Sequence, residues 1–124
     1  MAFSKISEVS PEHILFTDGT EITYDHYQNC CEINYADFEQ IDNIAMDTIF
    51  ETDNLMFQPV DGYGFRFGNE NKMFFVPCYS KQNGYYSDEV TIYVNGKAAL
   101  YVYAEEIKCK IILLNQYHMI RQKL

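Results

Sequence analysis

Two Asx-Gly dipeptides, Asp18-Gly19 and Asn95-Gly96, constrain the fold of this chain more than any other feature of the sequence. Each lies between two short runs that are rich in β-branched and aromatic residues. In that setting, an Asx-Gly dipeptide is a strong short-range signal of a β-hairpin. The first hairpin is predicted over residues 14–24 and the second over residues 89–103. The sequence therefore predicts a protein built largely from antiparallel strands.

The stretch between the two hairpins is rich in Phe and Tyr, which favour strands. Three further strands are predicted there, over residues 48–60, 62–68 and 72–78, because turn residues such as Gly and Asn separate them. Residues 35–46 carry apolar side chains at intervals close to one helical turn, and either a short helix or an irregular strand is compatible with that spacing.

The C-terminal segment differs in its periodicity. From Ala104 onward, acidic residues come first and basic residues last, which is the order that a helix dipole favours. One helical face would carry Ile107, Ile111, Leu114 and His118. The expected fold class is therefore α+β: a mostly antiparallel sheet with hairpins, one C-terminal helix and, as an option, one short internal helix.

The length of 124 residues and the 48% of hydrophobic residues are sufficient for one domain, which we expect to span residues 1–124. The longest aliphatic run, Ile111–Leu114, is far shorter than the roughly 20 residues of a membrane helix. Residues 1–10 alternate polar and apolar side chains, so no signal peptide is expected there. We expect a cytoplasmic protein with no membrane partner.

Acidic residues are concentrated in one part of the chain. The chain has 18 Asp and Glu against 9 Lys and Arg, and residues 6–65 contain 13 acids and no Lys or Arg. Such a charge distribution repels nucleic acid and attracts basic surfaces, including those of nucleic-acid enzymes. We therefore expect a basic protein partner and no direct binding of nucleic acid. The alternative is that the acidity only keeps the protein in solution.

The densest group of coordinating residues lies in residues 25–32. Thiolate and imidazole are the ligands that zinc prefers, and His26 and Cys30 converge because they are four residues apart. Cys31 or Glu32 could add a third ligand. A structural zinc ion is therefore a hypothesis for this segment, and the alternative is a small buried cysteine with no metal. The predicted ligands, with one remote cysteine after Pro77, are His26, Cys30, Cys31 and Cys78.

The chain has 11 Tyr and no Trp, and two of the tyrosines are adjacent in a predicted turn. Tyrosine is common in the parts of protein interfaces that contribute most to affinity, although tyrosines on alternating strand positions can also pack in a core. We predict that the contact with a basic partner involves acidic and aromatic side chains. The predicted partner-binding residues are Asp37, Glu39, Asp42, Asp47, Glu51, Asp53, Tyr85 and Tyr86.

Two segments, YDHYQNCCE at residues 24–32 and NGYYSDEV at residues 83–90, resemble a known sequence pattern. They are similar to a small uncharacterised domain family of bacteria and phages, with H-x-Q-D-C-C-E and N-G-Y-Y-S-E-x-V patterns. Asn29 stands where the family usually has Asp. The resemblance covers roughly residues 14–94. It implies no activity, but it favours a metal site that includes His26, the adjacent cysteines and Glu32.

The chain also resembles, in type, the small phage-encoded anti-CRISPR proteins, some of which hold zinc and block Cas9. This resemblance implies a non-enzymatic inhibitor of a type II CRISPR Cas9 in the bacterial cytoplasm, with a structural zinc ion. Two alternatives stay open. One is a metal-dependent enzyme in which Glu32 acts as general base beside an open metal position. The other is a metal-free regulatory module with a different partner.

Overall fold

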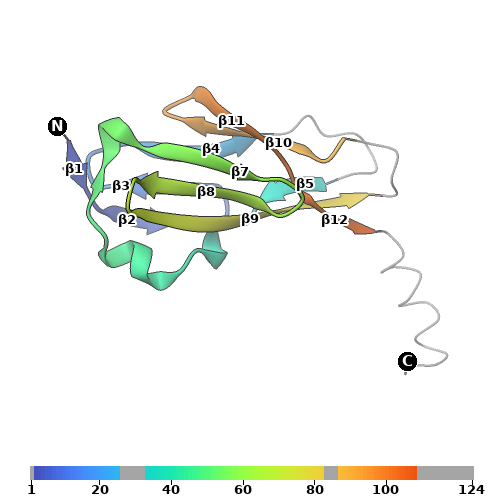
Figure 1. Cartoon of the computed structure of the whole chain (residues 1–124), viewed down its shortest axis with the longest axis horizontal. Coiled ribbons are helices and arrows are strands. Elements are labelled where there is room, and N and C mark those ends of the chain that lie inside the picture. Colours follow the sequence, from blue (N-terminus) through green and yellow to red (C-terminus); the bar gives the residue numbers. More distant parts are fainter. Residues whose placement is uncertain (1, 26–32, 83–86, 109–124) are drawn as a thin grey trace.

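The structure is a computed structural model, and it describes residues 2–25, 33–82 and 87–108 (Figure 1). Most of these residues belong to strands. The first six strands are β1 (Phe3–Ser4), β2 (Ile6–Val9), β3 (His13–Phe16), β4 (Glu21–Asp25), β5 (Ile33–Ala36) and β6 (Phe50–Glu51). The other six are β7 (Met56–Val60), β8 (Gly64–Asn69), β9 (Lys72–Gln82), β10 (Glu89–Val94), β11 (Lys97–Tyr103) and β12 (Glu105–Lys108).

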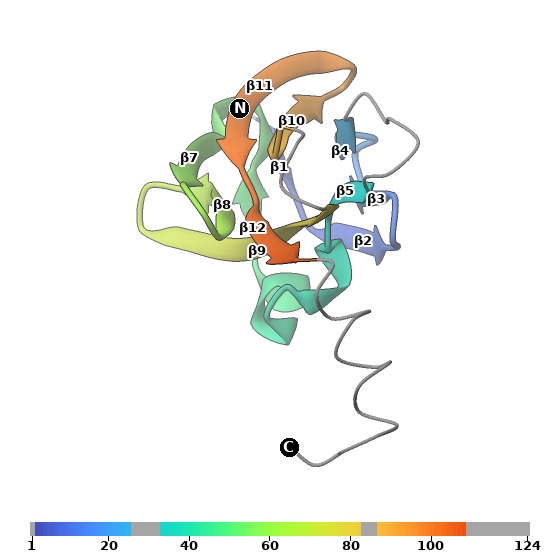
Figure 2. The same ribbon diagram turned by 90° about the vertical axis from the view of Figure 1, so that its right-hand side faces the viewer.

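The strands form two sheets and a short ribbon. One sheet has the order β11-β10-β4-β3-β2, and the other has the order β12-β9-β8-β7, with β5 also paired to β9. β1 and β6 form a separate two-stranded ribbon. Viewed from the end, the two larger sheets lie on opposite sides of a shared interior (Figure 2). The chain passes from the first sheet to the second between β11 and β12, at Ala104.

The interior is filled from both sheets by side chains at alternating strand positions, as the two-residue period of a strand requires. β3 and β4 bury Ile14 and Ile22, and β8 buries Phe65 and Phe67. Phe50 of the short ribbon joins the two layers. Its ring centroid lies 5.4 Å from that of Phe16 in β3 and 5.8 Å from that of Phe67 in β8. The segment around Phe50 is thus anchored in the core by aromatic packing.

Both predicted hairpins are confirmed. β3 and β4 pair in antiparallel register around Asp18-Gly19, and β10 and β11 pair around Asn95-Gly96. Gly19 and Gly96 have φ values of 93° and 82°, and Asn95 has a φ of 52°. These positive values are easily adopted only by Gly and Asn, which explains why the dipeptides were reliable signals.

The prediction of an α+β fold is wrong. The described residues contain no helix of seven residues or more, and the mostly antiparallel sheet accounts for their architecture. At the place where the C-terminal helix was expected to begin, Glu105–Lys108 forms β12, which pairs in parallel with residues 79–82 of β9. The edge of β9 provides hydrogen-bond partners for the backbone of residues 105–108. The spacing of apolar side chains in this segment, which suits a helix, does not reveal these partners. Residues 109–124 lie outside the described residues.

The optional internal helix is also absent as an α-helix. Residues 35–36 belong to β5, and two short 3-10 helices follow, η1 (Phe38–Gln40) and η2 (Asn43–Asp47), with a third, η3 (Thr52–Asn54), after β6. The helix-like spacing of apolar residues in residues 35–46 comes from η1 and η2. Each buries one side chain, Phe38 in η1 and Ala45 in η2. The strand predicted over residues 48–60 is correspondingly split into β6, η3 and β7.

Candidate functional site

The strands that flank the two segments resembling the family pattern pair with one another. Residues 26–32 follow β4 and precede β5, and residues 83–86 follow β9. Asp25, the last residue of β4, pairs with Thr91 of β10. Ile33, the first residue of β5, pairs with Lys81 of β9. Strand pairing therefore brings the flanks of the two segments together, although they are about 50 residues apart in the sequence.

A buried polar network joins these flanking strands. The hydroxyl of Ser80 donates to Asn34 Oδ1 at 2.6 Å and accepts from Gln82 Nε2 at 2.7 Å. Asn34 Nδ2 and Gln82 Nε2 both donate to the carbonyl oxygen of Ser87, at 2.7 and 3.2 Å. All three polar side chains are at most 1% exposed. Because a buried polar group is costly without partners, this network holds β5, β9 and Ser87 in one arrangement.

Cys78 lies two residues before Ser80 in β9 and is fully buried. Burial raises the pKa of its thiol to about 12. Burial is also the main reason why the pKa of Tyr24 in β4 is raised, with smaller contributions from Glu12 and Cys78. The Cys78 thiol is therefore protonated at neutral pH, whereas zinc binds the thiolate. Zinc binding by Cys78 would have to displace this proton.

The other three predicted zinc ligands, His26, Cys30 and Cys31, lie outside the described residues, so the zinc site stays a prediction. Glu32 is also outside them. Within residues 2–25, 33–82 and 87–108, no group of three or more His, Cys, Asp or Glu side chains is arranged to hold a metal ion.

The predicted acidic contact residues lie on one connection, from the end of β5 to η3. Glu39, Asp42, Asp47 and Asp53 are exposed, whereas Asp37 and Glu51 are partly buried. Two of these carboxylates shape the connection itself: Asp42 caps η2 by accepting from the amide of Ile44, and Asp37 accepts from Gln40 Nε2 at 2.7 Å. Tyr85 and Tyr86 lie outside the described residues.

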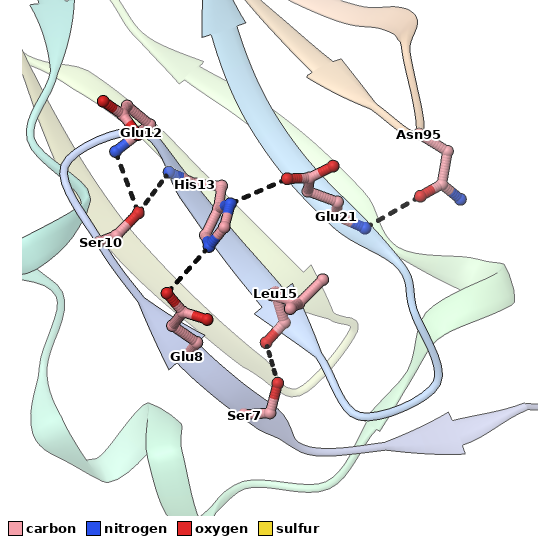
Figure 3. A network of polar contacts seen from close by, with 8 residues as sticks. All are labelled: Ser7, Glu8, Ser10, Glu12, His13, Leu15, Glu21 and Asn95. Carbon is pink, nitrogen blue, oxygen red and sulfur yellow. Dashed lines mark hydrogen bonds and ion pairs between the residues drawn. The ribbon is translucent and has the colours of Figure 1, made fainter.

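A polar network that the sequence did not reveal crosses the outer side of β2, β3 and β4 (Figure 3). His13 Nδ1 lies 2.8 Å from a carboxylate oxygen of Glu21, and His13 Nε2 lies 3.5 Å from one of Glu8. The contact with Glu21 is the stronger one, because Nε2 makes no hydrogen bond of acceptable geometry. His13 of β3 thus links β2 and β4. The contact depends on strand pairing, so the spacing of these residues in the sequence did not reveal it.

A shallow hollow with a volume of about 310 Å³ lies beside the β1–β6 ribbon. Asn69 organises it, because its side chain accepts from the amide of Glu51 and donates to the carbonyl oxygens of Glu51 and Asn54. The hollow is lined by Glu51, Asn54, Met56, Asn69 and Glu70. Its carboxylates extend the acidic connection toward β8.

These features define a small two-sheet β protein with an acidic connection between β5 and β7 and a buried polar network that joins β5, β9 and Ser87. The chain belongs to the family described as a domain of unknown function, DUF7448, whose model matches residues 2–92. The match confirms the resemblance to an uncharacterised family. It ends within β10, so β11 and β12 lie beyond it. No curated protein and no solved structure matches the chain. Among the described residues, no helix has the length and apolar character to cross a membrane.

Proposed function

We propose that this protein is a non-enzymatic, acidic inhibitor from a phage or another mobile element, and that it binds a basic surface of a host nucleic-acid enzyme. A type II CRISPR Cas9 is the proposed target. The observation that carries this proposal is the connection from Asp37 to Asp53, which has six carboxylates and no Lys or Arg. It leaves β5, passes below β9 and rises along the left-hand end of the molecule to β7 (Figure 1).

The connection is suited to binding because it is held in place from inside. Phe38, Ala45 and Phe50 are fully buried, and the residues Glu39, Asp42 and Asp47 between these anchors are exposed. An acidic surface that is already ordered loses little conformational entropy on binding. Its charge also speeds the encounter with a basic groove that normally holds nucleic acid. Occupation of that groove would exclude the guide or target strand.

A structural zinc ion is part of the same proposal. His26, Cys30 and Cys31 would hold it, with Cys78 as the fourth ligand. In this role the metal contributes to folding and takes no part in a reaction.

A Cas9 cleavage assay with charge variants tests the proposal. We expect excess wild-type protein to block cleavage of target DNA. The triple variant Glu39→Gln, Asp42→Asn, Asp47→Asn should raise the half-inhibitory concentration at least about tenfold, because amides keep the shape and the η2 cap but remove three charges. The matched control removes three exposed charges elsewhere, with Glu12→Gln, Asp61→Asn and Glu105→Gln.

Unchanged cleavage at excess protein would exclude Cas9 as the target. Equal loss of inhibition in the two triple variants would show that net charge matters and that the connection is not the contact. Inhibition that weakens as salt rises, in contrast, is expected for a contact steered by charge.

A further inference from the structure

Three large apolar side chains are exposed on or beside the acidic connection. Phe3, Ile44 and Ile49 are 61%, 62% and 61% exposed. A single exposed apolar residue is ordinary in a soluble protein. Three of them on neighbouring segments, among carboxylates, are typical of an interaction site.

The β1–β6 pairing places Phe3 on the outward face of the ribbon. Phe3 lies opposite Glu51, and Ser4 lies opposite Phe50. Ser4 and Phe50 are buried, so Phe3 and Glu51 are on the outward face of the ribbon. Ile49 directly precedes the inward Phe50 and is itself 61% exposed, so its side chain faces solvent.

Ile44 belongs to η2, and its backbone is held on both sides. Its amide donates to Asp42 Oδ1 at 3.0 Å, and its carbonyl oxygen accepts from the hydroxyl of Thr48 at 2.9 Å. The buried Thr48 directly precedes Ile49. These bonds fix the short path from Ile44 to the ribbon, so the exposed side chains are presented by an ordered backbone.

The charges around these side chains are mainly negative. Asp42 and Asp47 flank Ile44 in the sequence, and Glu51 lies opposite Phe3. Lys5 is the basic residue of the neighbouring N-terminal strand region. A second copy of the chain is a poor occupant, because a two-fold contact would place the same carboxylates against each other. The complementary surface is an apolar patch surrounded by Lys and Arg.

We propose that Phe3, Ile44 and Ile49 are the apolar anchors of an interface for a basic protein, and that the surrounding carboxylates select the partner. This inference rests on the proposed function, in which the acidic connection meets a basic surface. It adds that the affinity depends on apolar burial as well as on charge. Of the three anchors, none is among the contact residues that the sequence predicted.

Two labelled peptides test the inference in a fluorescence anisotropy titration. One alternates Lys with Leu, and the other has the same number of Lys residues with Ser in place of Leu. We expect the full-length protein to bind the Lys-Leu peptide at least about tenfold more tightly, because only that peptide can cover the apolar anchors. The triple variant Phe3→Ser, Ile44→Ser, Ile49→Ser should bind both peptides with the affinity that the wild-type protein has for the Lys-Ser peptide.

The matched control replaces three tyrosines of similar exposure outside the connection. Tyr63, Tyr101 and Tyr103 are 59%, 62% and 53% exposed. With all three changed to Ser, the preference for the Lys-Leu peptide should persist. Circular dichroism and a thermal melt on each variant show whether it is folded. If the Phe3, Ile44 and Ile49 variant does not fold, the single variant Ile44→Ser should still reduce the preference.

Equal binding of the two peptides by the wild-type protein would overturn the inference, and so would loss of the preference in the tyrosine variant alone. Neither result contradicts the proposed function, which the Cas9 assay and the charge variants test separately. Conversely, a Cas9 assay without inhibition together with a preference for the Lys-Leu peptide would reject the target and keep the apolar interface.

Discussion

Asn95 and Glu21 are joined by two hydrogen bonds. Asn95 Oδ1 accepts from the amide of Glu21 at 2.9 Å, and the amide of Asn95 donates to the carbonyl oxygen of Glu21 at 2.9 Å. Asn95 belongs to the turn between β10 and β11, and Glu21 begins β4. These bonds attach the turn of the second hairpin to the first, and the β4–β10 pairing continues the attachment along the sheet.

We expect Asn95→Ala to lower the free energy of unfolding by about 2 kcal/mol. Roughly half comes from placing a side chain other than Asn or Gly at a φ of 52°, and roughly half from the lost side-chain hydrogen bond. Asn95→Gly separates the two effects, because it keeps the favourable φ and loses only the bond. Urea denaturation of the three proteins provides the measurement. Equal stabilities of the Ala and Gly variants would contradict the argument from φ.

Ser80→Ala should lower the free energy of unfolding by about 1–3 kcal/mol, because it removes a buried hydroxyl that bonds both Asn34 and Gln82. The control is Ser7→Ala, which removes an exposed hydroxyl bonded to the carbonyl oxygen of Leu15 and should change stability by less than about 0.5 kcal/mol. Chemical denaturation measures both. Similar values for the two variants would show that the buried network adds little to the stability.

In the metal-free protein, prepared with a chelator, the Cys78 thiol should make the stability fall at alkaline pH. Its pKa rises from 9.0 to about 12 on folding, so between these values the unfolded chain has lost a proton that the folded chain keeps. The contribution of the Cys78 thiol to the free energy of unfolding is therefore fully present below pH 9. It is lost as the pH rises above 9, by up to about 1.4 kcal/mol per pH unit. Cys78→Ala should flatten this part of the wild-type stability curve. Parallel curves from pH 8 to 11 would contradict the prediction.

The His13–Glu21 contact should stabilise the first sheet, because it joins β3 to β4 with 2.8 Å between His13 Nδ1 and a carboxylate oxygen of Glu21. A double-mutant cycle with His13→Gln and Glu21→Gln isolates the coupling. Glu21 is partly exposed, so we expect a coupling energy of about 0.5–1 kcal/mol from urea denaturation of the four proteins. A coupling energy of zero would show that the contact adds nothing to the stability.

Metal analysis by mass spectrometry tests the proposed zinc ion. We expect about one zinc per purified wild-type chain and clearly reduced zinc in His26→Ala and in Cys30→Ala, because a structural site needs all of its ligands. Cys78→Ala tests whether this remote cysteine is the fourth ligand. Full occupancy in both His26→Ala and Cys30→Ala would show that the ligand assignment is wrong.

Features that depend on neighbouring residues could be predicted from the sequence. The hairpins followed from Asp18-Gly19 and Asn95-Gly96, because the turn type depends on the conformations that those residues themselves adopt. The exposed acids were also predictable, since a charged side chain without a partner is costly to bury. Local patterns failed after Ala104, where the spacing of apolar residues suited a helix and the backbone instead pairs with β9.

The apolar anchors were missed for a related reason. Hydrophobicity alone does not distinguish Ile44 and Ile49 from Ile41, which is buried. The three residues lie within nine positions, and their exposure depends on how η1 and η2 turn the chain.

The sequence by itself determined the strand-rich composition, both hairpin turns and the concentration of acids in one half of the chain, because each depends on residue types and short-range geometry. The tertiary structure decided which distant parts of the chain are in contact. It pairs β12 with β9, places His13 between the carboxylates of Glu8 and Glu21, and pairs the strands that flank the two motif segments. Those contacts join residues far apart in the chain. Their free energy depends on packing and backbone pairing between both partners, and neither partner's local sequence contains that information.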